Sequence, residues 1–80
     1  MLSKRLDSLA AGETARVMSV LGDDSMSQRI LDLGFTAGAT TRCLYASAAG
    51  NPKAYYIRGA IIALRNADAN KIAVCEEAVL

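Results

Sequence analysis

The residue type with the most distinctive chemistry in this chain is cysteine, which occurs only at Cys43 and Cys75. The two lie too far apart for a C-x-x-C motif and are too few for a secreted disulfide scaffold. The chain has no histidine, so a closed zinc site would need two carboxylates beside these thiols, or a second copy of the chain. We therefore expect both cysteines to be small apolar side chains in or near the core. We expect no cofactor, and no metal site tighter than a weak surface site.

The remaining polar residues do not form a catalytic set. The serines and threonines have no histidine to act as a base, and the 8 acidic residues show no pair at a spacing that implies a shared site. The segment Gly50-Asn51-Pro52 lacks the lysine pattern of a phosphate-binding loop. We therefore predict that the protein is not an enzyme and has no catalytic residues.

Composition and charge narrow the choice of partners. The chain has 80 residues, 52% of them hydrophobic, which predicts one domain over residues 1–80 with a single core. Its formal charge of +1 comes from scattered residues, so nucleic-acid binding is disfavoured. It has no apolar leader and no stretch of about 20 apolar residues, so we expect a cytoplasmic protein without direct membrane insertion. Self-association is left open.

Short apolar segments separated by turn residues favour a small barrel over a helical bundle. Strands are expected over residues 13–21, 40–46, 54–58, 61–65 and 71–76, with a brief 3₁₀ turn over 66–70. Val17 and Val20 are three apart, which puts them on opposite faces of a regular strand and indicates a bulge. The predicted fold is mainly β, with five to six strands and one sizeable helix, Ser25–Leu33, inserted after the first strand.

The ends of this helix carry clear signals. Ser25 and Gln28 have the spacing of a capping box, in which the hydroxyl accepts from a free backbone N–H and the amide reaches back. Gly34 follows the last apolar position, where a left-handed cap favours a residue without a Cβ. Phe35 comes next as a core anchor, and Gly38 closes the following turn.

The apolar residues of the helix fall into two sets. Met26, Ile30 and Leu33 share one stripe, which is expected to face the core. Leu31 lies more than about 90° from the centre of that stripe, so it is available for a second surface. We expect Leu31→Ala to leave the melting curve nearly unchanged while weakening capture of a partner, and Leu33→Ala to unfold the domain.

Three arginines are further candidates. Arg29 flanks the stripe, three residues before Asp32, and is expected to form a surface ion pair or to contribute to a partner surface. Arg58 and Arg65 are each expected to face solvent or to pair with Asp68.

The tyrosines are expected in the wall and rim of the barrel, although an exposed tyrosine among apolar neighbours also suits a peptide groove. The candidate partner-binding residues are therefore Leu31, Arg29, Tyr45, Tyr55 and Tyr56.

Several separated blocks of the sequence are similar to the FeoA family. The matching residues are Leu6, Leu9 and Gly12 before the first turn; Arg29, Ile30, Leu33, Gly34, Phe35 and Gly38 around the helix end; the Arg58-Gly59 step; and Leu64, Arg65, Asp68, Ala69, Ile72 and Val74 near the end of the chain. Ala37 departs from the pattern, because it stands where the family usually has proline. The resemblance spans nearly the whole chain.

This resemblance implies both a fold and a function. The fold would be an SH3-like barrel. The function would be that of a small, non-enzymatic accessory protein of bacterial ferrous-iron uptake, which binds the cytoplasmic side of FeoB, a GTP-driven membrane transporter. Iron itself would not be carried by this chain.

Two alternatives remain at the level of sequence. The same module resembles the C-terminal SH3-like domain of iron- and manganese-dependent transcriptional repressors, which would make this chain a stand-alone regulatory domain. A metal-binding chaperone is the third hypothesis, and it rests on Cys43 and Cys75 alone.

Overall fold

The computed structural model describes residues 3–76. The strands are β1 (Ser3–Arg5), β2 (Thr14–Val20), β3 (Thr40–Ala46), β4 (Lys53–Ile57), β5 (Ala60–Leu64) and β6 (Ile72–Glu76). The helices are the 3₁₀ turn η1 (Leu6–Ser8), the longer α1 (Ser25–Asp32) and the one-turn α2 (Asn66–Ala69).

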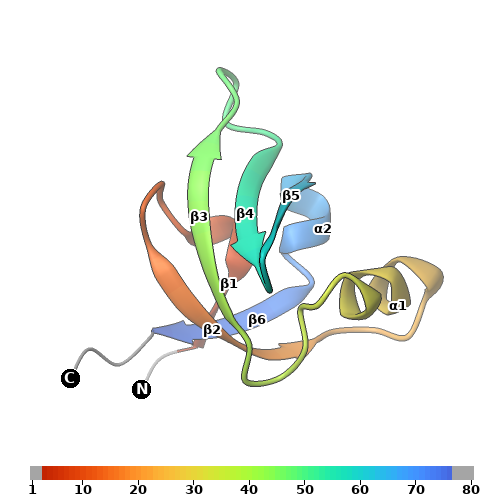
Figure 1. Cartoon of the computed structure of the whole chain (residues 1–80). Coiled ribbons are helices and arrows are strands. Elements are labelled where there is room, and N and C mark those ends of the chain that lie inside the picture. The colour runs from red at the N-terminus through yellow and green to blue at the C-terminus, as the bar shows by residue number, and fades with distance from the viewer. Residues whose placement is uncertain (1–2, 77–80) are drawn as a thin grey trace.

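The six strands form one antiparallel sheet in the order β1-β6-β2-β3-β4-β5. Figure 1 shows this sheet curled around its interior, with α1 projecting at one side and α2 beside β5. Strands β1 and β5 are the two edges, so the ladder stays open between them. The Lys53 ammonium group donates to the carbonyls of Asp7 (2.6 Å) and Leu9 (2.9 Å), which ties β4 to the segment around η1. The prediction of a mainly β fold with one sizeable helix is confirmed.

The structure corrects three local predictions. The chain begins its sheet one element earlier than expected, at β1, so α1 follows the second strand. Residues 66–69 form a turn of α-helix instead of a 3₁₀ turn. The helix cap is Asp24, whose carboxylate accepts from the Ser27 N–H, so the predicted capping box of Ser25 and Gln28 is wrong.

Two strands carry irregularities that bend the sheet. The pairing of β2 with β6 shifts register between Val17 and Ser19, which confirms the predicted bulge. A second shift lies between Cys43 and Tyr45, where β3 pairs with β4. Bulges increase the local twist, as a sheet that curls on itself requires.

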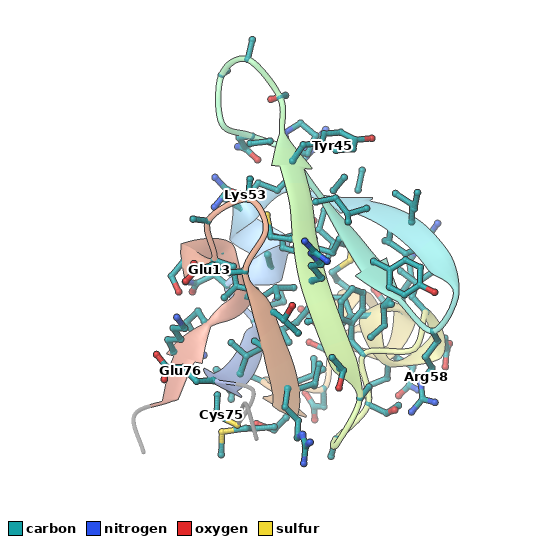
Figure 2. The ribbon with its side chains drawn as sticks, turned by 60° about the vertical axis from the view of Figure 1, so that its left-hand side comes forward. Glu13, Tyr45, Lys53, Arg58, Cys75 and Glu76 are labelled. Atoms are coloured by element: carbon teal, nitrogen blue, oxygen red, sulfur yellow. The ribbon has the colours of Figure 1, made fainter. Side chains whose placement is uncertain are left out.

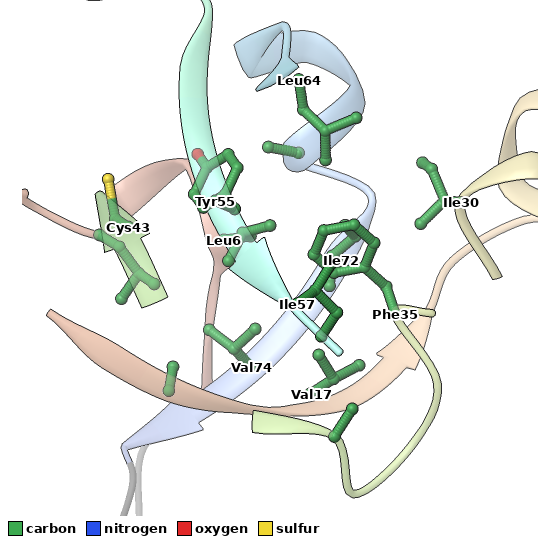
Figure 3. Packing of buried hydrophobic residues seen from close by; sticks show 14 residues of the cluster. Leu6, Val17, Ile30, Phe35, Cys43, Tyr55, Ile57, Leu64, Ile72 and Val74 are labelled. Atoms are coloured by element: carbon green, nitrogen blue, oxygen red, sulfur yellow. The ribbon is translucent and has the colours of Figure 1, made fainter. Parts of the chain in front are cut away.

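The core is a single cluster drawn from every part of the described chain. It contains Leu6, Leu9, Ala15, Val17, Ile30, Phe35, Ala39, Cys43, Tyr55, Ile57, Leu64, Ala69, Ile72 and Val74. Figure 3 shows Phe35 and Ile30 reaching this cluster from the helix side. Ile72 and Val74 have no exposed surface. The predicted burial of the two cysteines is confirmed, and both are free thiols.

Strands β4 and β5 are joined by the two-residue turn Arg58-Gly59. Both residues have positive φ, 47° at Arg58 and 83° at Gly59. This is the pattern of a type I′ turn, which matches the right-handed twist of a hairpin. The resemblance singled out these two residues, and the structure gives them this geometric role.

Candidate partner-binding site

A groove lies between α1 and the edge strand β5. Its volume is about 430 Å³, and its lining is mainly apolar. The lining residues are Met26, Arg29 and Leu33 from the helix side, Ile62, Ala63, Leu64 and Arg65 from the β5 side, and Asp68 from α2. A second hollow of about 440 Å³ shares Met26 and Arg29 with this α1–β5 groove and continues over the exposed face of the helix. Helix α1 therefore presents two adjoining concave surfaces.

The N-terminal end of α1 is fastened to its surroundings by polar contacts. The Asp24 carboxylate accepts from the Ser27 N–H at 2.9 Å, and the Ser27 hydroxyl donates to the Leu21 carbonyl at 2.7 Å. Lys71 forms an ion pair with Asp24 at 3.1 Å. Hydrogen bonding from Ser27, followed by the contact with Lys71, lowers the pKa of Asp24 to about 2.

This lowered pKa predicts an acid-sensitive contribution to stability. Because the pKa of Asp24 is about 2 when folded and 3.8 ordinarily, its stabilising effect is complete above about pH 4 and is lost as the pH falls through 2. We expect wild-type protein to lose more stability between pH 5 and pH 2 than Asp24→Asn, which keeps a good helix cap without the charge. Urea unfolding at several pH values measures the difference. Parallel curves for the two proteins would contradict this role of Asp24.

The C-terminal end of α1 is held by Arg58 of the β4–β5 turn. Its guanidinium group donates from Nε to the Gly34 carbonyl at 3.2 Å and from Nη2 to the Thr36 hydroxyl at 2.9 Å. Figure 2 shows Arg58 on the side of the molecule where α1 lies. Of the two alternatives expected for Arg58, the structure shows the solvent-facing one: the residue is exposed, and its polar partners are Gly34 and Thr36 instead of Asp68. These contacts join the segment that follows α1 to the β4–β5 turn.

The helix residues divide differently from the sequence expectation. Arg29 lies in the groove, and among residues 3–76 it forms no ion pair with Asp32, which instead accepts from the Gln28 amide at 3.4 Å. Leu33, expected in the core, is half-buried: it packs against the core and also lines the groove. Leu31 is half-buried too, but it lies outside the core cluster and does not line the groove.

The three tyrosines occupy different environments. Tyr55 has no exposed surface, so it is a core residue and the prediction that it contributes to a partner surface is wrong. Burial raises the pKa of its phenol, and its hydroxyl has no hydrogen-bond partner among the described residues. Tyr45 is 59% exposed and Tyr56 is 47% exposed. Figure 2 shows Tyr45 at the end of β3, near the loop of residues 47–52 that joins β3 to β4 and well away from Arg58.

The cysteines give no support for a metal site. Burial raises the pKa of the Cys43 thiol, which disfavours the thiolate that a metal would need. Within residues 3–76, no group of three or more histidine, cysteine, aspartate or glutamate side chains is placed to hold an ion.

Sequence reasoning missed the groove itself. It placed Met26 and Leu33 on one helix face, but it did not place them beside Ile62 and Leu64 of β5. The distinguishing signal was weak: at about 100° per residue Ile30 lies at one edge of the helical stripe and is fully buried, whereas Met26 and Leu33 lie toward the other edge and are half-buried. The rim charges Arg29, Arg65 and Asp68 form no ion pair within the described part of the chain.

A comparison with protein families identifies the family to which this chain belongs. The family model described as FeoA domain matches residues 4–75. A comparison with curated proteins found no significant match. In the part of the chain that the structure describes, no helix has the length and apolar character needed to span a membrane.

Solved structures with the same fold cover most of the chain. The FeoA protein of Chlorobium tepidum is 31% identical with a TM-score of 0.85, over 92% of this chain and 70% of that one. Stenotrophomonas maltophilia FeoA, complexed with zinc and described as a prokaryotic SH3 domain protein, is 27% identical with a TM-score of 0.80, over 89% and 88%. A manganese-dependent transcriptional repressor is 20% identical with a TM-score of 0.82, over 94% of this chain and 42% of its own. The expectation of an SH3-like fold is confirmed.

Proposed function

Because this chain belongs to the FeoA family of iron-transport proteins, we propose that it is a non-enzymatic accessory module that docks on the cytoplasmic side of the FeoB iron transporter. The observation that carries this proposal is the α1–β5 groove. In this groove, apolar side chains of α1 and β5 are not covered by other described parts of the chain. Grooves of this size and lining are common sites of recognition. Docking would change transport by binding one conformation of the transporter more tightly than another.

The charges at the rim of the groove indicate which kind of partner segment it would bind. Arg29 and Arg65 are exposed guanidinium groups, and Asp68 is the single carboxylate among the lining residues. The excess of positive charge favours a partner segment that brings a carboxylate to an apolar anchor. Arginine at the edge of an apolar groove is also a frequent source of binding energy.

Capture from membranes that contain the transporter tests this surface. We expect Arg29→Glu to weaken capture by tenfold or more, the effect of about 1.4 kcal/mol, because it reverses a charge at the rim of the groove. The matched control is Arg42→Glu, which makes the same change at an exposed position on β3 and should bind as wild type. Melting curves of both variants should stay near that of wild type.

The variant Leu31→Ala distinguishes the two faces of the helix. If Leu31→Ala abolishes capture and Arg29→Glu does not, the partner binds the opposite face of α1 and the groove assignment is wrong. If neither changes capture, the exposed side chains Tyr45 and Tyr56 become the next surface to test. Failure of the wild-type protein to bind these membranes would contradict the proposed function itself.

A second function is favoured by the likeness to the manganese-dependent repressor, in which a similar domain forms part of a longer chain. On this alternative the protein is a stand-alone regulatory domain that binds a segment of a DNA-binding partner. Identification of the captured protein separates the two candidates, because one predicts a membrane transporter and the other a helix-turn-helix protein.

A further inference from the structure

The free edge of β5 lacks the features that normally prevent a strand from pairing with another chain. Proteins usually protect such edges with charged side chains, proline or a bulge. The other edge, β1, carries Lys4 and Arg5. Strand β5 reads Ala-Ile-Ile-Ala-Leu, pairs with β4 without a register shift, and exposes 63% of Ile61. Its outer edge is therefore open, apolar and regular.

The turn that precedes β5 determines which backbone groups face outward. In a two-residue type I′ hairpin, the residues on either side of the turn, Ile57 and Ala60, are hydrogen-bonded to each other. Hydrogen bonding alternates along an antiparallel pair, so Ile62 also bonds to β4, whereas Ile61 and Ala63 direct their N–H and C=O groups away from it. Within residues 3–76, neither Ile61 nor Ala63 makes a backbone hydrogen bond to any other segment.

These outward groups are self-complementary. If two copies of β5 run antiparallel about a two-fold axis at Ile62, Ile61 of each copy lies opposite Ala63 of the other. Both outward residues of each strand are then satisfied, giving four backbone hydrogen bonds. We propose that β5 is a self-association edge, through which two copies of this chain form a reversible dimer with one continuous sheet.

The side chains near the edge are compatible with this pairing. Tyr56 is the cross-strand neighbour of Ile61 and is 47% exposed, so an apolar pair borders the edge in each copy. In the same register, Arg65 falls opposite Gly59 and Arg58 opposite Asn66, so no like charges face each other. A contact of one short strand is small, so the dimer is expected to be weak and to depend on concentration.

Sedimentation equilibrium of the whole chain tests this edge. From about 10 μM to about 1 mM, the range suited to a small interface, the mean mass of wild type should rise from monomer toward dimer. Ile61→Lys, which places a charge on the edge, and Ala63→Pro, which removes an outward N–H, should both remain monomeric. Met18→Lys is the matched control, since Met18 is a 46% exposed apolar residue on β2, and it should dimerise as wild type.

Amide hydrogen exchange gives a residue-level test that folding defects do not mimic. The amides of Ile61 and Ala63 should exchange more slowly as concentration rises, while that of Ile62, already bonded to β4, should not change. A wild-type protein that stays monomeric up to about 1 mM overturns the proposal, as does a dimer that survives both Ile61→Lys and Ala63→Pro. A monomer whose capture by transporter membranes is weakened by Ile61→Lys assigns this edge to the transporter instead.

Discussion

Replacement of Phe35 by alanine is expected to cost about 3–5 kcal/mol of the free energy of unfolding, the usual range for removing a buried aromatic ring. Phe35 has no exposed surface and is among the largest side chains of the core. A domain of 80 residues has a total stability of roughly 4–12 kcal/mol, so this single change would leave a large fraction of the protein unfolded. Urea unfolding followed by circular dichroism measures the loss.

A matched aromatic control is available at Tyr45. It is 59% exposed, so Tyr45→Ala should change stability by no more than about 0.5 kcal/mol. If Phe35→Ala and Tyr45→Ala have similar effects, the ring of Phe35 does not anchor the core and the packing in Figure 3 is incorrect.

Gly34→Ala has the second-largest expected effect, because two costs combine at this position. Gly34 has φ of +116°, a conformation that costs a residue with a Cβ about 1–3 kcal/mol. An added Cβ would also lie 3.1 Å from Cδ of Arg58, whose guanidinium group is held by the carbonyl of Gly34 itself. Thermal or urea unfolding should show a loss larger than that of Gly12→Ala, where φ is +91° and no atom lies within 4 Å of the added Cβ.

A double-mutant cycle separates the two costs. In an Arg58→Ala background the crowding at Gly34 disappears, so Gly34→Ala should then cost about as much as Gly12→Ala. If the effect of Gly34→Ala is unchanged by Arg58→Ala, the strain is confined to the backbone and Arg58 does not restrict the helix end.

The features that sequence analysis predicted correctly are local ones. The stop of α1 before Gly34 follows from one glycine after a helical stripe, and Phe35, expected as a core anchor directly after that glycine, has no exposed surface. The bulge near Val17 was visible because Val17 and Val20 break the alternation of a regular strand. In each case the residues that carry the signal lie within a few positions of one another.

The features that it missed depend on distant partners. Strand β1 has three residues and no apolar alternation, and it exists because β6 pairs with it. Tyr55 and Tyr56 are adjacent and chemically alike, so their opposite burial is decided by the register of β4 against β3. Asp24 and Ser25 are both good caps, and the choice between them depends on Ser27, whose hydroxyl bonds to Leu21.

The same distinction applies to the residues that line the groove, which stays a proposed binding site. Arg29 was chosen because it flanks the helical stripe, and it lies in the groove. Ile62 and Ala63 could not be assigned to that groove, because their place beside α1 depends on the Arg58 contacts that join the β4–β5 turn to the end of the helix. A groove lined by two elements that lie far apart in the chain, α1 and β5, leaves no local pattern in the sequence.

The position of β6 between β1 and β2 has a consequence for how the protein is made. Ser3 of β1 pairs with Cys75, and Ala15 of β2 pairs with Glu76. Strands β1 and β2 therefore cannot form these pairs before β6 is present. A chain emerging from the ribosome therefore carries β1 without its strand partner, and β2 with one open side, until β6 has been synthesised. Such non-local pairing slows folding and leaves strand edges exposed in the meantime. The sheet is therefore completed only when β6 enters it, and a chain that ends before Ile72 would lack the strand that lies between β1 and β2.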